Sequence, residues 1–100
     1  MDLNKYPWDI ESNSAEEIYC SHFIEHLTKE ELQPLMEEFK RIIKDGARIT
    51  LRMPHADTDG AYDYSHRTVW NEKSASGFFR SIGFDIKDIS NQDGNLTVIL

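Results

Sequence analysis

The strongest hydrophobic pattern in the chain begins near Thr28 and extends to Lys44. Its apolar residues follow one another at steps of three or one, the spacing that places side chains on one stripe of a helix. These residues are Leu32, Leu35, Met36, Phe39, Ile42 and Ile43. Thr28 and Glu31 form the capping-box pattern T-x-x-E at the start, and Gly46 is a natural stop after the end. We predict an amphipathic helix that packs this stripe on a core.

Four shorter stretches have the character of strands. The first, "EIYCS", begins at Glu17, ends at Ser21 and is rich in strand-forming residues. The second, "ARITLRM", alternates strictly and predicts a strand with one apolar face. One side carries Ile49, Leu51 and Met53, and the other carries Arg48, Thr50 and Arg52. The last two, "GFDIKDI" and "LTVIL", are separated by "NQDGN", in which Asp93-Gly94 is typical of a hairpin turn.

A second helix is predicted around residues 72–81. Its apolar stripe consists of Ala75, Phe78, Phe79 and Ile82. The order of elements is then β-α-β-α-β-β. The crossover helices imply parallel strands, and the last two strands form an antiparallel hairpin. The sequence therefore predicts a single α/β domain over residues 1–100 with a mixed sheet.

Charge and cysteine content limit the partners of such a domain. The formal net charge is −7 and the sequence pI is about 4.9. Nucleic-acid binding rests largely on Lys and Arg contacts to phosphate, so we expect no nucleic-acid partner. We also expect no membrane association, because the N-terminus lacks an apolar signal region and no apolar run approaches the roughly 20 residues of a span. The single cysteine, Cys20, cannot form an internal disulfide, which favours a cytoplasmic location.

One short motif raises the question of a metal. The stretch "CSHFIEHL" contains His22, Glu25 and His26 in the pattern H-x-x-E-H, which on one helix can hold zinc and a general base. Zinc needs at least a third ligand, and His55 and His66 are available. However, a strand ends near the motif's start and a new helix begins just after it.

We therefore predict no metal site in this motif. His22 is expected to line a pocket at the carboxyl end of the first strand. His26 is expected to be an ordinary helix-face residue that one hydrogen bond satisfies.

The stretch "PHADTDGAYDYSHRTVWN" is too long for a simple connector. Loops of this length are usually functional or disordered. One interpretation is a lid that faces a substrate, and the other is a solvated loop anchored by its aromatic residues. Asp57 and Asp59 suggest calcium, but the further acidic ligands of a calcium loop are missing, so no calcium site is predicted.

Taken in order, these stretches resemble the C-terminal half of a class I S-adenosylmethionine-dependent methyltransferase of the small-molecule type. The segment "DLNKYPWDIESNSAEEIYCSHFIEHL" resembles the family's chain from the end of its third strand through its fourth. The segment "EEFKRIIKDGARITLRMPH" resembles the run R-x-L-K-P-G-G-x-L-x-x-x-x-P. "SIGFDIKDI" resembles the family's G-F strand, and "LTVIL" resembles its last, antiparallel strand.

The resemblance implies a fold and a set of site residues. The sheet order would be "EIYCS", "RITLRM", "LTVIL" and "GFDIKDI", with both helices on one face. S-adenosylmethionine would be the cofactor and a small molecule the methyl acceptor. Asp2 and Leu3 would lie at the adenine, and Ser21 and His22 would line the methionine side. His22, His55 or His66 would act as the catalytic base.

The sequence also departs from the family. The glycine-rich loop of the family's first strand and the acidic residue of its second strand have no counterpart, and "K-P-G-G" reads Lys44-Asp45-Gly46-Ala47. A lone chain is therefore expected to bind the cofactor weakly or not at all. The strand from Glu17 to Ser21 would be a bare sheet edge. That edge predicts either a two-fold homodimer or a partner chain that supplies the N-terminal half. The alternative function is a non-catalytic dimerising or regulatory module derived from a methyltransferase.

Overall fold

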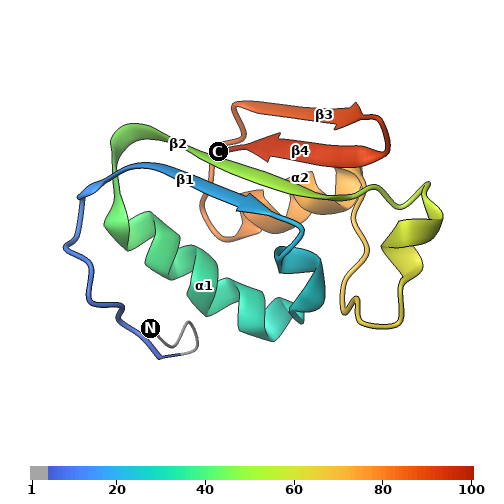
Figure 1. Ribbon diagram of the computed structural model, residues 1–100. Helices are drawn as coiled ribbons and strands as arrows, with labels where there is room; N and C mark the ends of the chain where they lie inside the picture. Colours follow the sequence, from blue (N-terminus) through green and yellow to red (C-terminus); the bar gives the residue numbers. More distant parts are fainter. Residues whose placement is uncertain (1–4) are drawn as a thin grey trace.

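Four strands form one open mixed sheet in the order β1-β2-β4-β3 (Figure 1). The computed structural model describes residues 5–100. The strands are β1 (Ala15–Ser21), β2 (Ile43–Pro54), β3 (Asp88–Gln92) and β4 (Asn95–Ile99). β1 runs parallel to β2, and β4 is antiparallel to both of its neighbours. The predicted strand order and the predicted C-terminal hairpin are therefore confirmed.

Two α-helices cover one face of this sheet (Figure 1). They are α1 (Lys29–Ile42) and α2 (Glu72–Ser81), and two short 3-10 helices, η1 (Ile24–His26) and η2 (Asp59–Tyr62), lie in the connections. The predicted capping box is present, because Glu31 N–H donates to Thr28 Oγ1 at 3.2 Å and Thr28 N–H donates to Glu31 Oε1 at 3.1 Å. Such a cap stabilises a helix by about 1 kcal/mol. Within the described part of the chain, no helix is long and apolar enough to cross a bilayer.

The core lies between the helices and the inner face of the sheet. Its most deeply buried side chains are Leu32, Met36, Leu51, Met53, Trp70, Ala75, Phe79, Leu96 and Val98. The alternation predicted for β2 is present: Ile49, Leu51 and Met53 are buried. Arg48 on the opposite face is exposed and Arg52 is half-buried. The sheet therefore has one apolar face and one polar face, as a sheet covered by helices on a single side requires.

The junction between α1 and β2 differs from the prediction. The helix ends at Ile42, and β2 begins at Ile43 without a separate turn. Gly46 does not stop the helix but lies inside β2 with φ +80. Ala15 pairs with Ile43 and Glu17 with Arg48, so two steps along β1 match five along β2. Gly46 thus supplies the left-handed conformation that an irregular strand needs at this bulge.

The stretch "GFDIKDI" was predicted as a strand, and this is wrong for most of its length. Gly83 has φ +93 and its N–H bonds to Arg80 O at 3.1 Å, which ends α2. The following apolar residues pack on the core from a loop, and β3 begins only at Asp88. The hairpin turn is as predicted, because Asp93 (φ 54) and Gly94 (φ 82) both have the positive φ of a type I′ turn.

The segment before β1 is held along α1 by one charged pair. Arg41 binds Glu38 through two hydrogen bonds, from Nε at 2.8 Å and from Nη2 at 2.7 Å. Glu38 also accepts the Trp8 N–H, and Arg41 donates to Trp8 O at 3.1 Å. The bonds from Arg41 hold the pKa of the Glu38 carboxyl below its usual value. The Trp8 ring packs edge-on against Phe39, so the segment contributes to the core.

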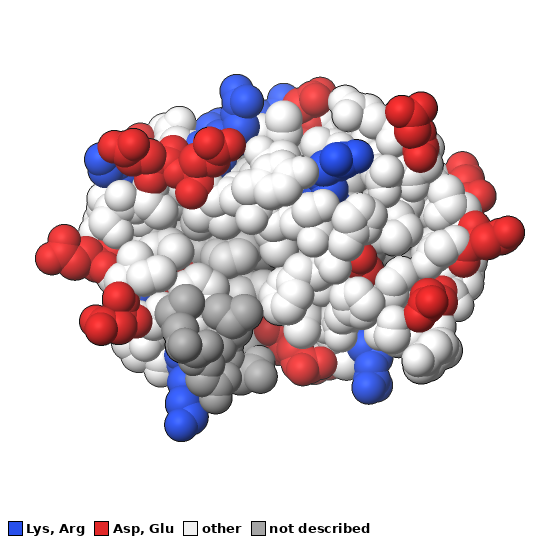
Figure 2. Space-filling view, viewed as in Figure 1, with Lys and Arg blue, Asp and Glu red and all other residues white. Residues whose placement is uncertain are grey.

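Charged side chains are spread over the surface. Figure 2 shows acidic side chains around much of the periphery of the face that Figure 1 presents, with fewer basic ones between them. The sequence contains 18 Asp and Glu against 11 Lys and Arg. The surface in this view therefore carries no extended basic patch.

Candidate functional site

The carboxyl ends of β1 and β2 lie side by side. Ser21 pairs with Arg52 at the end of the parallel ladder, and the His22 N–H continues it to Arg52 O at 2.8 Å. His22 directly follows β1, and His55 directly follows β2. Ligands of open α/β sheets bind outside the carboxyl ends of parallel strands. This edge is therefore the candidate site.

His22 has an unusual backbone conformation. Its φ is +54, in the left-handed region that a non-glycine residue adopts at a cost of about 1–3 kcal/mol. Its side chain is half exposed, and Nδ1 lies 3.6 Å from Glu25 Oε2. Backbone strain of this kind is concentrated at functional sites. The conformation turns the chain from β1 into η1 and leaves the imidazole at the sheet edge.

Glu25 is the least expected residue of this edge. Its side chain is 3% exposed, and neither carboxylate oxygen has a hydrogen-bond partner among residues 5–100. Its backbone oxygen is well satisfied, because it accepts the N–H groups of Arg67 (2.7 Å) and Thr68 (3.1 Å). A buried carboxylate without hydrogen bonds is costly. The sequence gives no sign of this burial, since Glu25 lies in a polar motif.

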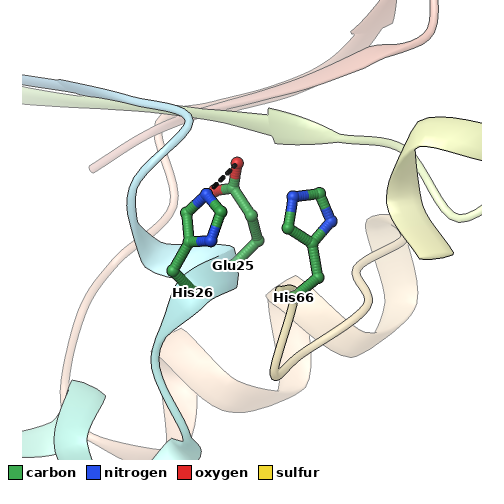
Figure 3. A group of neighbouring side chains, drawn as sticks. All are labelled: Glu25, His26 and His66. Atoms are coloured by element: carbon green, nitrogen blue, oxygen red, sulfur yellow. Dashed lines mark ion pairs between the residues drawn. The ribbon is translucent and has the colours of Figure 1, made fainter. Parts of the chain in front are cut away.

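His26 and His66 face one another next to Glu25 (Figure 3). Their ring centroids are 4.7 Å apart and the rings are nearly perpendicular, at 78°. His26 Nδ1 lies 3.3 Å from Ser65 O, and His66 Nδ1 lies 3.1 Å from Ala61 O. His26 thus has the hydrogen bond expected for it. The contact with His66 depends on the path of the long loop, which no local pattern predicts.

His55 is buried and engaged on both ring nitrogens. Nε2 lies 2.5 Å from Glu72 Oε1, and Nδ1 accepts the Asp57 N–H at 3.0 Å. The interaction with His55 holds the pKa of the Glu72 carboxyl below its usual value. His55 therefore joins the end of β2 to the first turn of α2. Of the three histidines predicted as the base, His22 and His66 lie near Glu25, and His55 belongs to a separate pair.

The polar face of the sheet places the side chains of Tyr19 and Arg52 at this edge. Tyr19 is exposed and lies on the same face as Ser21 and Arg52. Its contact with the Arg52 guanidinium, followed by that with Ser21, holds the pKa of the Tyr19 phenol below its usual value. The alternation along β1 places Tyr19 and Ser21 on one face. That alternation is the signal that would have found Tyr19 from the sequence.

The long loop is anchored at its stem and exposed at its tip. The Ala56 N–H donates to Trp70 O at 2.8 Å, and Trp70 is buried and stacked on Phe79. Tyr62 and Tyr64 are exposed. Trp70 thus anchors the stem as the second interpretation expects, and the tip places two tyrosines in solvent. Asp57 and Asp59 are exposed near the stem.

The remaining candidates lie elsewhere. Asp2 and Leu3 lie outside the described residues. A hollow of about 690 Å³ lies at the amino end of β2, the end opposite His22 and His55. Two of the lysines that line it already bind backbone oxygens: Lys40 donates to Ile82 O and Lys87 to Ala47 O. This hollow therefore lies away from the chemistry of the carboxyl edge.

Cys20 provides a chemical test of the inner side of this edge. Burial, and then the charge of Glu25, raise the pKa of the Cys20 thiol from 9.0 to about 11. At about pH 8 its thiolate fraction is then about 100-fold below that of an ordinary thiol. We expect iodoacetamide to alkylate Cys20 more slowly by about this factor in the native protein than in urea. Because the native state holds the proton more tightly, the free energy of unfolding should fall as pH rises from about 9 to about 11. Similar alkylation rates in the two states would contradict this.

Comparison with known proteins gives a fold and no close relative. No family model matches the sequence, and no curated protein matches it. Among solved structures, a SAM-dependent methyltransferase from Archaeoglobus fulgidus is 14% identical with a TM-score of 0.76 over 99% of this chain and 64% of its own. One from Aquifex aeolicus is 18% identical with a TM-score of 0.71 over 99% and 50%.

A third structure is a complex between the Haloferax volcanii Trm112 methyltransferase activator and a methyltransferase. The matching chain is 12% identical with a TM-score of 0.76, over 99% of this chain and 58% of its own. This chain thus spans about half to two thirds of the length of these structures. The predicted resemblance to part of a methyltransferase is confirmed at the level of structure. The chain has the fold of one part of an S-adenosylmethionine-dependent methyltransferase domain, a partial Rossmann-like α/β sheet with helices on one face.

Proposed function

We propose that this chain forms one part of an S-adenosylmethionine-dependent methyltransferase and supplies the side of the cleft at the carboxyl ends of β1 and β2. The observation that carries the proposal is the TM-score of 0.76 over 99% of the chain with such an enzyme. The position of Ser21 and His22 agrees with it, because both lie where open α/β sheets bind ligands. The acceptor in this proposal is a small molecule.

Each candidate residue has a role in this proposal. Asp2 and Leu3 contact the adenine, and the Ser21 hydroxyl and His22 line the methionine end of the cofactor. Residues 5–100 fit the methionine end alone, because they contain no glycine-rich turn for the rest of the cofactor. When bound, S-adenosylmethionine supplies an electrophilic methyl group, and the protein contributes mainly by positioning the acceptor for in-line attack.

His22 is the first choice for a base that removes the acceptor's proton. Its side chain is half exposed, and its nearest charged partner is Glu25. Its imidazole is therefore accessible to an acceptor at the sheet edge. His66 is the second choice, and His55 the third, because both of its nitrogens are already engaged.

The site requires a second wall, and β1 offers the place to add it. β1 is an edge strand of the sheet, next to β2 alone among the described strands. Edge strands pair readily with further strands. We propose that β1, from Glu17 to Ser21, pairs either with a partner chain that carries the glycine-rich wall or with a second copy of this chain. The unpaired Cys20 agrees with a cytoplasmic location.

Calorimetric titration with S-adenosylmethionine tests the proposal, first on this chain alone and then on the chain mixed with the polypeptide encoded directly upstream. We expect little or no binding by the chain alone and one bound equivalent in the mixture. In the mixture, Ser21→Ala or His22→Ala should weaken binding by about tenfold, the loss of one hydrogen bond. Ser90→Ala, on β3, is the matched control and should leave binding unchanged.

Light scattering on the same samples separates the alternatives. A heterodimer that binds the cofactor supports the proposal that this chain is part of a methyltransferase. A homodimer that binds no cofactor with or without the upstream polypeptide favours the alternative function, a non-catalytic dimerising or regulatory module; the open edge of β1 is the observation behind it. Tight cofactor binding by the chain alone would show that residues 1–100 need no second wall.

A further inference from the structure

We propose that Glu25, His26 and His66 form a binding site for a divalent transition-metal ion, with zinc as the preferred ion. Each residue offers one ligand atom, and these atoms all lie within 4.8 Å of one another (Figure 3). This differs from the site that the motif H-x-x-E-H suggests, in which His22 and His26 share one helix. The motif by itself predicts no metal site, because the helix that would present both histidines is missing. The structure supplies the third ligand from the long loop instead.

The two histidines are oriented as metal ligands are. His66 Nδ1 is paired with Ala61 O and His26 Nδ1 with Ser65 O. A backbone carbonyl only accepts hydrogen bonds, so the neutral tautomer that makes these bonds carries its proton on Nδ1 and keeps the lone pair on Nε2. Metal-binding histidines commonly donate their second N–H to a carbonyl or carboxylate in this way, which fixes the ring and raises its basicity. Both Nε2 atoms are therefore prepared to bind a metal.

Glu25 supplies the independent observation. Its carboxylate is almost fully buried, and neither oxygen has a hydrogen-bond partner among residues 5–100. The nearest side chains that could pair with it are imidazoles, with Nδ1 of His22 at 3.6 Å and Nε2 of His26 at 4.0 Å. A buried charge of this kind is retained at a cost unless it is paired or coordinates a metal. A divalent cation between Glu25 and the two histidines would give it that partner.

The backbone holds the ligands together before any metal binds. Glu25 O accepts two N–H groups from the loop, those of Arg67 and Thr68, directly after His66. The Thr68 hydroxyl lies 3.4 Å from Ile24 O. These bonds attach the loop that carries His66 to η1, which carries Glu25 and His26. A metal would therefore bind to a site whose ligands are already assembled, which reduces the entropy cost of binding.

The ligand set indicates the ion and the type of site. Two imidazole nitrogens and one carboxylate oxygen suit zinc among the common divalent ions. Three protein ligands leave a fourth position for water, the arrangement of zinc sites that act on substrates. Tetrahedral ligand atoms at about 2.1 Å from zinc lie about 3.4 Å apart. The ligand atoms here lie within 4.8 Å of one another, so they would have to move closer together to bind zinc. The His26 side chain is 40% exposed, so it has room to make this movement, and the fourth position stays open to solvent.

This proposal does not rest on the proposed function, and its test needs neither the cofactor nor a partner chain. The chain is freed of metal with a chelator and titrated with Zn²⁺ by calorimetry. We expect one equivalent to bind. We also expect Co²⁺ to bind with the intense visible absorption of a four-coordinate site. E25Q, H26Q and H66Q should each weaken binding by at least about 100-fold, more than outer-shell changes usually do.

His22→Gln is the matched control, because His22 lies beside Glu25 but outside the proposed ligand set. It should leave zinc affinity unchanged. Circular dichroism checks that each variant is folded, and the exposed position of His26 makes H26Q the variant least able to disturb folding. Absence of zinc binding in the unmodified chain overturns the proposal. Binding that survives E25Q but is lost in H22Q and H26Q also overturns it, because the ligands would then be the histidines of the motif.

Discussion

Replacing Phe79 by alanine is expected to remove about 3–5 kcal/mol from the free energy of unfolding, the usual cost of deleting a buried aromatic side chain. Phe79 is fully buried on α2. It stacks on Trp70 at 5.8 Å and meets Phe78 edge-on at 5.3 Å. Small domains have only about 5–15 kcal/mol of stability in total. The variant should therefore unfold in far less urea than the parent, as measured by circular dichroism.

Phe78→Ala is the matched control, since Phe78 neighbours Phe79 on the same helix but is only half-buried. It should cost clearly less, about 1–2 kcal/mol, in proportion to the smaller area it buries. Equal losses for the two variants would show that α2 contributes through its whole length rather than through the contact of Phe79 with Trp70. Such a result would contradict the position of the core given above.

Replacing Glu25 by methionine should change the free energy of unfolding in the opposite direction, toward greater stability. With a chelator present, we expect Glu25→Met to raise the free energy of unfolding by about 1–3 kcal/mol at neutral pH. The reason is that the substitution removes a buried carboxyl group that has no hydrogen bonds, which relieves its desolvation cost, and methionine fills a similar volume. With saturating Zn²⁺ the order should reverse, because only the parent gains the free energy of metal binding. Urea unfolding under the two conditions measures both values.

Glu30→Met controls for the general effect of losing one acidic residue. Glu30 is exposed in the first turn of α1, so this change should stay within about 0.5 kcal/mol under both conditions. If Glu25→Met destabilised the metal-free protein by more than 1 kcal/mol, the carboxylate would have a stabilising partner of its own. The observation that supports the metal site would then be lost.

Local signals in the sequence were sufficient for much of the fold. The capping box at Thr28, the alternation in β2 and the Asp93-Gly94 turn each rest on neighbouring residues, and each is present. The sheet order followed from the resemblance to methyltransferases and is also present. The register of β3 could not be predicted locally. It is set by pairing with β4 outward from the turn, so the apolar residues before Asp88 pack from a loop.

The candidate site was predictable in part for the same reason. Ser21 and His22 could be placed because the end of a parallel strand has a fixed position in the sheet. The cluster of Glu25, His26 and His66 joins residues about 40 positions apart through hydrogen bonds of a long loop. No spacing rule relates such residues. The burial of Glu25 also depends on that loop, whose N–H groups bind the backbone of η1.

The hydrogen-bonded stem of the long loop changes what ordering its tip would cost. His55 and Trp70 are joined by a β-bridge, so the residues between them already form a closed loop. The entropy of bringing the loop ends together is therefore lost when the chain folds, not when a ligand arrives. A ligand that orders the exposed Tyr62 and Tyr64 would then reduce the conformational entropy of only a few tip residues. Any contact made by the tip would therefore carry a small conformational cost.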